Sequence, residues 1–275
     1  MENFINSFDN VQIYYKKSES KISDTHKLTL ILLHGMGGDS SAWNDEVELF
    51  NKLGYDCIAV DLRGHGLSGR PDNAKSYQIK NFAKDILEII KIEKLDKFIL
   101  VGHCFGGMIS IIYQALLTNS SLALILIDTS YRPPFFSKFM LSSLFLNKYI
   151  DLIINKLPNY HIKEHTNFKN YIGTGDYSLK RLLSDILHTS LKSYLLSSVE
   201  VINYDATYLL NSILVPTLVI EGKNDTIFPI KVAEDLKNRI VNSQLDIIKG
   251  ANHILVINNP IDIVSHIHTY LTKII

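Results

Sequence analysis

The sequence has few cysteines and no surplus of charge. Only two of its 275 residues are cysteine, Cys57 and Cys104, and neither lies in a spacing typical of zinc sites. This pattern excludes a disulfide framework and a zinc ribbon. Lys+Arg and Asp+Glu each number 28, so the formal net charge is zero. A balanced charge gives no indication of a nucleic-acid partner or of an anionic membrane surface.

Long hydrophobic runs are also missing. The longest ones, such as LTLILL and LALILI, are far shorter than the roughly 20 residues that cross a bilayer, so we expect no membrane span. The N-terminal stretch MENFINSFDNVQIYY contains acidic residues and lacks the apolar core of a signal peptide. We therefore expect a cytoplasmic location, where a free thiol stays reduced.

Short apolar runs alternate with amphipathic stretches along most of the chain. This alternation predicts an α/β fold, with a mostly parallel sheet covered by helices on both faces. An earlier run, Val11–Lys16, alternates polar and apolar residues and is expected to be an edge strand. The expected buried strands are Leu28–Leu33, Tyr55–Val60, Phe98–Val101, Leu122–Ile127, Pro216–Glu221 and Gln244–Ile248. The expected helices are Ser40–Leu53, Ile79–Ile92, Gly107–Leu117, Ile230–Arg239 and Pro260–Thr272.

The alternation stops between about residues 131 and 205. This segment has apolar residues at helical spacing and no convincing strand, so it predicts a helical insertion. We expect a core of residues 1–130 and 206–275 and a helical cap of residues 131–205. Its aromatic residues either line an acyl pocket or seat the cap on the core, and the second interpretation is favoured for most of them: Phe135, Phe136, Phe139, Phe145 and Tyr149.

The stretch VGHCFGG, residues 101–107, places G-x-C-x-G between a strand and a helix. That context is typical of a nucleophile elbow, whose glycines allow a turn too tight for a Cβ. The helix N-terminus would favour the thiolate of Cys104. The competing interpretations are an inert buried thiol and a cysteine that replaces a serine. Cys57 lies in mid-strand and is expected to be a core residue.

A base and an acid follow in the order that such an elbow needs. Asp225 and His253 each lie in a loop after a late strand. His253 would take the proton of Cys104, and Asp225 would orient the imidazole. Asp128, which also ends a strand, is a weaker candidate for the acid.

Acyl transfer also needs donors for the developing oxyanion. The loop HGMGG, residues 34–38, follows the first long strand. The backbone N–H groups of Met36 and Phe105 are therefore expected to form an oxyanion hole.

Five segments together resemble the α/β-hydrolase superfamily: LLHGMGG, VDLRGHGLSGRP, VGHCFGG, EGKNDTIFP and GANHILVINNP. They occur in that family's order and spacing, and the resemblance covers nearly the whole chain. It points to the capped branch that is similar to esterases and lactonases, and the helical insertion falls where the family places its cap. The departure is Cys104, because most members of this branch have serine there. Some relatives, the dienelactone hydrolases among them, use cysteine.

Two other motifs are interpreted as incidental. GHGLSG, residues 64–69, matches a dinucleotide-binding pattern, but Arg70-Pro71 follows where a helix should begin, so no nicotinamide or flavin cofactor is expected. HIKEH, residues 161–165, matches a metalloprotease pattern but lies in the insertion, and no metal is expected. Asp61 and Arg63 are expected to form a structural pair.

The sequence thus predicts a hydrolase of small carboxylic esters, thioesters or lactones that forms a covalent acyl-enzyme on Cys104. Its expected partner is a small acyl substrate, and nothing indicates the oligomeric state. The alternatives are acyl transfer or a lyase step at the same site, a serine hydrolase in which cysteine replaces serine, and a ligand-binding protein without turnover.

Overall fold

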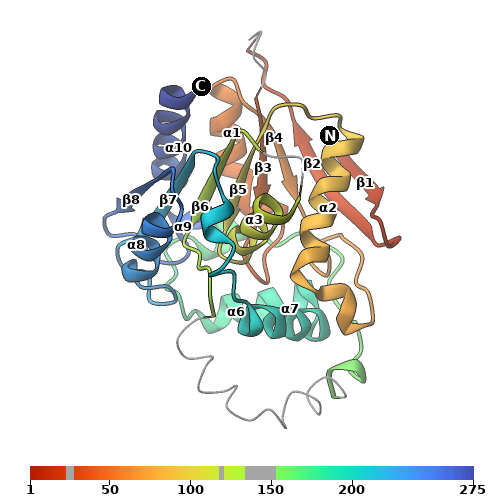
Figure 1. Cartoon of the computed structure of the whole chain (residues 1–275). Coiled ribbons are helices and arrows are strands. Elements are labelled where there is room, and N and C mark those ends of the chain that lie inside the picture. The colour runs from red at the N-terminus through yellow and green to blue at the C-terminus, as the bar shows by residue number, and fades with distance from the viewer. Residues whose placement is uncertain (23–27, 118–120, 134–152) are drawn as a thin grey trace.

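One eight-stranded sheet forms the centre of the molecule. The computed structural model describes residues 1–22, 28–117, 121–133 and 153–275. Within these residues the strand order is β1-β2-β4-β3-β5-β6-β7-β8 (Figure 1). The strands are β1 (Glu2–Asn6), β2 (Gln12–Ser18), β3 (Thr29–Leu33), β4 (Asp56–Val60), β5 (Phe98–His103), β6 (Ala123–Ile127), β7 (Thr217–Gly222) and β8 (Ser243–Ile248).

The sheet is parallel from β4 through β8, and only β1 and β2 run antiparallel to their neighbours. The expected α/β class is confirmed, and all six expected strands are present. The expectation that Gln244–Ile248 is buried is wrong, because β8 is the other edge of the sheet and only its Ile248 is buried. The expectation that Val11–Lys16 forms an edge strand is wrong, because β1 pairs with the outer side of β2. Only Ile5 of β1 is buried, so this strand lacks the apolar pattern that would have revealed it.

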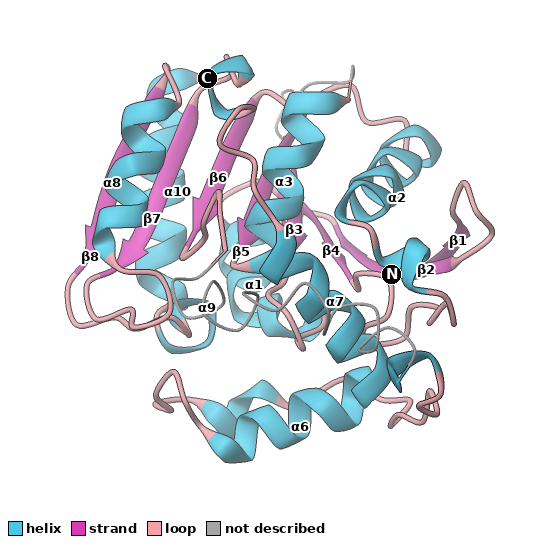
Figure 2. Cartoon of the chain, turned by 60° about the horizontal axis from the view of Figure 1, so that its bottom comes forward, coloured by secondary structure: helices cyan, strands magenta, loops and turns pink. Residues whose placement is uncertain are grey.

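Helices cover both faces of the sheet (Figure 2). The short helix α9 precedes α10, and the described connections also contain single-turn 3₁₀ helices at 40–43, 74–77, 168–171 and 210–212. None of the helices in the described residues combines the length and hydropathy needed to cross a membrane. The helices of the core are α1 (Asn44–Lys52), α2 (Ile79–Ile92), α3 (Phe105–Leu116), α8 (Ile230–Arg239), α9 (Leu255–Asn258) and α10 (Pro260–Ile274).

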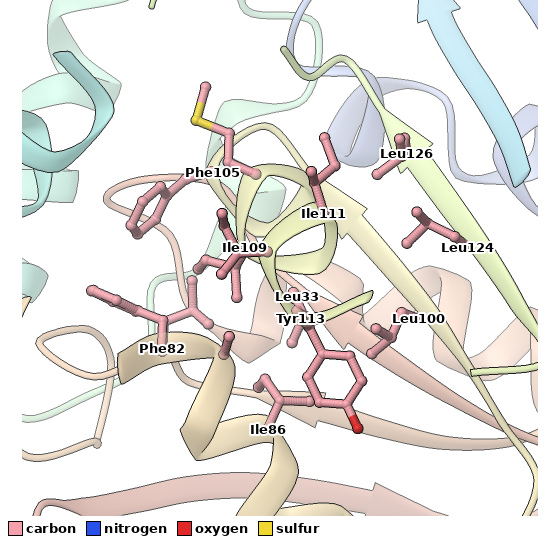
Figure 3. Packing of buried hydrophobic residues seen from close by; sticks show 14 of the residues in the cluster. Leu33, Phe82, Ile86, Leu100, Phe105, Ile109, Ile111, Tyr113, Leu124 and Leu126 are labelled. Atoms are coloured by element: carbon pink, nitrogen blue, oxygen red, sulfur yellow. The ribbon is translucent and has the colours of Figure 1, made fainter. Parts of the chain in front are cut away.

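Alternate residues of the buried strands supply two separate cores. In β3, Ile31 and Leu33 face the cluster that contains α2, α3 and α8, whereas Leu30 and Leu32 face α1 and α10. Figure 3 shows the first cluster, in which residues of α3 lie between α2 and the strands. This burial on both sides explains why the strands are continuously apolar.

The described part of the insertion contains two longer helices, α6 (Leu179–Thr189) and α7 (Leu191–Asn203), and no strand within residues 153–205. The five aromatic residues considered for an acyl pocket (135, 136, 139, 145 and 149) lie outside the described residues. Leu196 and Tyr204 join the core cluster on the α3 face. Arg70 of the core donates to the carbonyl oxygens of His188 and Thr189 at 2.7 and 3.0 Å. The insertion is therefore bonded directly to the core.

Helix α3 approaches the sheet so closely that one position admits only glycine. A Cβ on Gly106 would lie 2.3 Å from the carbonyl oxygen of Leu33. We predict that Gly106→Ala lowers the free energy of unfolding by about 3 kcal/mol or more, since backbone must shift to make room. The melting temperature should fall by about 6 °C or more. Gly175→Ala is the matched control, because nothing lies within 4 Å of a Cβ there, and equal melting temperatures for both variants would contradict the prediction.

Candidate active site

The turn at Cys104 holds its side chain in a strained backbone conformation. Cys104 lies between β5 and α3 with φ +49° and ψ −112°, and it is the residue that caps α3. Non-glycine residues rarely adopt a positive φ, and such strain concentrates at functional sites. The carbonyl oxygen of Cys104 accepts hydrogen bonds from the N–H groups of Gly107 and Met108 and from the Thr129 hydroxyl. The turn is thus fixed from two directions.

Two glycines of the VGHCFGG stretch make this turn possible. A Cβ on Gly102 would lie 2.4 Å from the carbonyl oxygen of Gly106. Gly106 in turn lies against β3, as described above. The half-buried thiol of Cys104 therefore lies where the first turn of α3 meets the end of β5, as the elbow motif predicts.

Asp225 and His253 meet across the loops that follow β7 and β8. The Nδ1 atom of His253 donates to Oδ2 of Asp225 at 2.7 Å, and both side chains are buried. The other oxygen of Asp225 accepts from the backbone N–H groups of Ile227 and Phe228 at 2.6 and 2.8 Å. Asp225 is therefore held in place by its own loop, and it fixes the tautomer and orientation of the imidazole.

The pKa of His253 depends on its interactions with Cys104 and Asp225. Burial works against the charged imidazole, but interactions with Cys104 and with Asp225 hold the pKa of His253 well above its usual range. The three side chains that the sequence assigns to nucleophile, base and acid are therefore gathered at one place.

Two further carboxyl groups lie behind this histidine. Burial, with the nearby charge of Asp225, raises the pKa of Asp128 to about 8. Burial, Asp128 and Asp225 raise the pKa of Glu221 to about 11. Both are therefore protonated at neutral pH, and Asp225, which makes the printed bond to His253, is the better candidate for the ionised acid.

The loop after β3 lies against Cys104. A Cβ on Gly35 would be 3.3 Å from Cβ of Cys104, which brings the following residue, Met36, to the same place. The backbone N–H groups of Met36 and Phe105 donate no hydrogen bond within the described parts of the chain. Phe105 is also the first residue of α3, where N–H groups have no partner inside the helix. Both groups are free to bind an oxygen.

A small cavity of about 60 Å³ opens onto Cys104, His253 and Met36. Its wall includes three residues of the insertion, namely Phe168 and, on α6, Arg181 and Asp185. Arg181 donates from Nη1 to Oδ2 of Asp185 at 3.1 Å. The insertion therefore contributes charged side chains to the surroundings of the thiol.

The insertion also supports the histidine loop through Asp176. One oxygen of Asp176 accepts from the backbone N–H of His253 at 2.9 Å, and the other accepts from the N–H of Thr226 at 2.9 Å. Arg181 donates to the carbonyl oxygen of Asp176 at 3.0 Å. Sequence reasoning missed these residues, since a lone Asp or Arg in a helical insertion carries no motif.

The other side chains that the sequence singled out form hydrogen bonds within the fold or lie in its core. His165 of HIKEH binds Oδ2 of Asp61 at 2.9 Å, whereas His161 contacts the carbonyl oxygen of Asn159, so the two histidines do not converge. The expected pair of Asp61 and Arg63 is wrong, because Arg63 forms a two-pronged bond to Asp85 instead. Cys57 is fully buried, as expected.

Three groups of acidic residues and histidine in the described residues are close enough to hold a metal ion. Two of them, His103 with Asp128 and His253, and Asp128 with Glu221 and Asp225, consist of side chains around the candidate triad. The third group comprises Asp39, Asp61 and His165. Its carboxylate oxygens accept hydrogen bonds from backbone N–H groups of Ser40, at 2.7 Å, and Thr166, at 2.8 Å. Protein donors thus already occupy these oxygens, and the group connects the core with the insertion.

His103 lies beside the elbow and donates from Nε2 to the carbonyl oxygen of His253 at 2.9 Å. Burial and His253 lower its pKa to about 3, so it is neutral.

A model of the family described as "alpha/beta hydrolase fold" matches residues 29–260. The chain belongs to this family. Among individual proteins, it is similar to a "Putative esterase/lipase" of Haemophilus influenzae, with 26% identity over 257 residues that cover 89% of this chain and 83% of that protein. It is also 26% identical to the "AB hydrolase superfamily protein YisY" of Bacillus subtilis, over 83% of this chain and 85% of that protein.

Solved structures agree on the fold. The "Esterase (EaEST) from Exiguobacterium antarcticum" superposes with a TM-score of 0.75 at 21% identity. The superposition covers 99% of this chain and 100% of that one.

The bond between His165 and Asp61 should make the attachment of the insertion depend on pH. Burial disfavours the charged imidazole, but Asp61, Asp39 and Glu2 outweigh it and raise the pKa of His165. The stabilisation is fully present below the pKa of an unfolded histidine, about 6.5, and is lost as the pH rises through the higher folded value. We predict that His165→Gln lowers the free energy of unfolding by about 1 kcal/mol at pH 6 and by less at pH 9.

Thermal unfolding of both proteins at the two pH values measures this difference. His161→Gln is the control, because burial lowers the pKa of His161, so its effect should have the opposite pH dependence. A cost of His165→Gln that is equal at pH 6 and pH 9 would count against the charged bond.

Proposed function

We propose that this protein is a hydrolase that cleaves small carboxylic esters, thioesters or lactones through an acyl-enzyme on Cys104. The observation that carries the proposal is the bond from His253 to Asp225, together with the interaction with Cys104 that raises the pKa of the same histidine. The similarity to a Haemophilus influenzae protein named as an esterase/lipase supports the same reaction class. No cofactor or metal is required by this chemistry.

In the first half-reaction, the thiolate of Cys104 attacks the substrate carbonyl carbon and a C–S bond forms. The N–H groups of Met36 and Phe105 stabilise the oxyanion. The intermediate collapses as the C–O or C–S bond to the leaving group breaks, and the imidazolium of His253 gives its proton to that group. Asp225 keeps the imidazole oriented throughout.

In the second half-reaction, neutral His253 removes a proton from water, which attacks the acyl-enzyme thioester. The C–S bond to Cys104 then breaks, the carboxylic acid leaves, and the thiolate and imidazolium are restored. Residues 131–205 act as the cap in this scheme, because Arg181 and Asp185 of that segment line the cavity beside the thiol.

A sulfur nucleophile restricts the range of substrates that the enzyme can hydrolyse efficiently. A thiolate attacks well at neutral pH but is also a good leaving group from the tetrahedral intermediate. Cys104 therefore suits activated acyl groups, such as thioesters, lactones and aryl esters, better than alkyl esters or amides.

We predict a burst of product when the enzyme meets a 4-nitrophenyl ester, because acylation of Cys104 should be faster than release of the acid. Intact mass of the unmodified enzyme should show one acyl adduct, on Cys104. Prior alkylation of the enzyme with iodoacetamide should abolish the burst, the turnover and this adduct. Alkylation of Cys57 is not expected, because burial raises its pKa. An unchanged rate after complete alkylation of Cys104 would overturn the proposal.

Two measurements distinguish related reactions. An added alcohol or amine that captures the acyl group would indicate acyl transfer instead of hydrolysis. A large gain of ester hydrolysis in Cys104→Ser would indicate a site adapted to a serine.

The choice between the two candidate acids can be tested with near-isosteric amides. Asp225→Asn should lower kcat by about 10³–10⁴-fold, because it removes the acceptor that fixes the His253 tautomer. Asp128→Asn should change kcat by less than about tenfold, since the carboxyl it replaces is already neutral. Both variants should first be compared by circular dichroism and thermal unfolding. The reverse order of the two losses in kcat would assign the acid to Asp128.

A further inference from the structure

Within the described part of the chain, the guanidinium of Arg181 has one donor without a hydrogen-bond partner. Arg181 lines the same cavity as Cys104 and His253. Its Nη1 binds Asp185 and its Nη2 binds the carbonyl oxygen of Asp176. Its Nε is buried and has no hydrogen-bond partner among the described residues. An unsatisfied buried donor is costly, so a site that keeps one is suited to a ligand that supplies the acceptor.

The charge of Arg181 is only partly balanced. Its side chain is 21% exposed, and Asp185, its ionic partner within the described residues, is 4% exposed. Burial raises the pKa of Asp185 to about 7, against the opposing effect of Arg181. Near neutral pH, Asp185 is therefore protonated for part of the time, and the cavity then carries a net positive group. A substrate anion would restore the balance.

The position of Arg181 is fixed by two partners within the insertion. Asp176, which holds the backbone of His253, also accepts from Arg181, and Asp185 anchors it from the next turn of α6. A guanidinium held in this way loses little freedom when it binds a planar anion. Carboxylate is the planar anion that an ester substrate would most simply carry.

We propose that Arg181 is a specificity-determining residue that binds a carboxylate in the substrate, so that half-esters or half-thioesters of short dicarboxylic acids are preferred. This inference rests on the proposed function of Cys104. Charge-assisted binding to guanidinium gives the second carboxylate its affinity, and the neutral carbonyl is presented to the thiol.

Hydrolysis of paired substrates tests this preference. Monophenyl succinate, glutarate and adipate should be compared with phenyl butanoate, pentanoate and hexanoate, each corrected for its rate without enzyme. We expect kcat/KM of at least one half-ester to exceed that of its neutral partner by about tenfold or more. Arg181→Gln should remove that advantage, so that kcat/KM of the half-ester falls about tenfold more than kcat/KM of its neutral partner, and Arg181→Lys should keep part of the advantage. Lys180→Gln, a neighbouring cation outside the cavity wall, is the matched control and should change neither substrate class.

Because Arg181 also supports Asp176, a merely structural role must be separated from recognition. Equal losses of kcat/KM for charged and neutral esters in Arg181→Gln would show such a role and overturn the inference. So would hydrolysis through Cys104 with no preference for any half-ester.

A binding experiment keeps the inference testable even if no ester is hydrolysed, which would count against the proposed function alone. Succinate, glutarate or adipate should slow the alkylation of Cys104 by iodoacetamide in the wild-type protein. The concentration that gives half-protection should rise about tenfold in Arg181→Gln. Absence of protection by all three dianions in the wild-type protein would overturn the assignment of Arg181.

Discussion

The contact between Gly102 and the carbonyl oxygen of Gly106 is the constraint on which the site depends. A Cβ on Gly102 would lie 2.4 Å from that oxygen, so only glycine fits where the chain turns from β5 into α3. The strain falls on Cys104, which adopts a positive φ. Strands β7 and β8 bring the loops of Asp225 and His253 to the same edge of the sheet as Cys104, because the carboxyl ends of parallel strands meet there.

Burial, as much as ion pairing, determines which carboxyl groups near the turn are ionised. Three carboxyl groups lie near one histidine, yet burial keeps two of them neutral. Like charges that cannot be solvated do not ionise together. The remaining carboxyl, Asp225, receives two backbone N–H groups and the imidazole. The environment therefore selects which of several similar side chains carries the charge.

The features that the sequence predicts correctly are those determined by residues close together in the chain. Runs of apolar residues located six strands, and glycines around Cys104 located the turn, because period and steric fit are properties of short segments. It missed β1, whose single buried side chain, Ile5, leaves no pattern. It also missed Asp176 and Arg181, since their roles arise only when an insertion folds back on distant loops.

The bonds of Asp176 have a consequence for how this protein could change over evolution. The loops that carry Thr226 and His253 are held by a carboxylate from a different part of the chain. A segment that supplies support to the reacting groups cannot be exchanged as a free module, since any replacement must offer an acceptor at the same place. Variation in substrate range is therefore expected to proceed by change of individual side chains on α6, with the backbone around Asp176 retained.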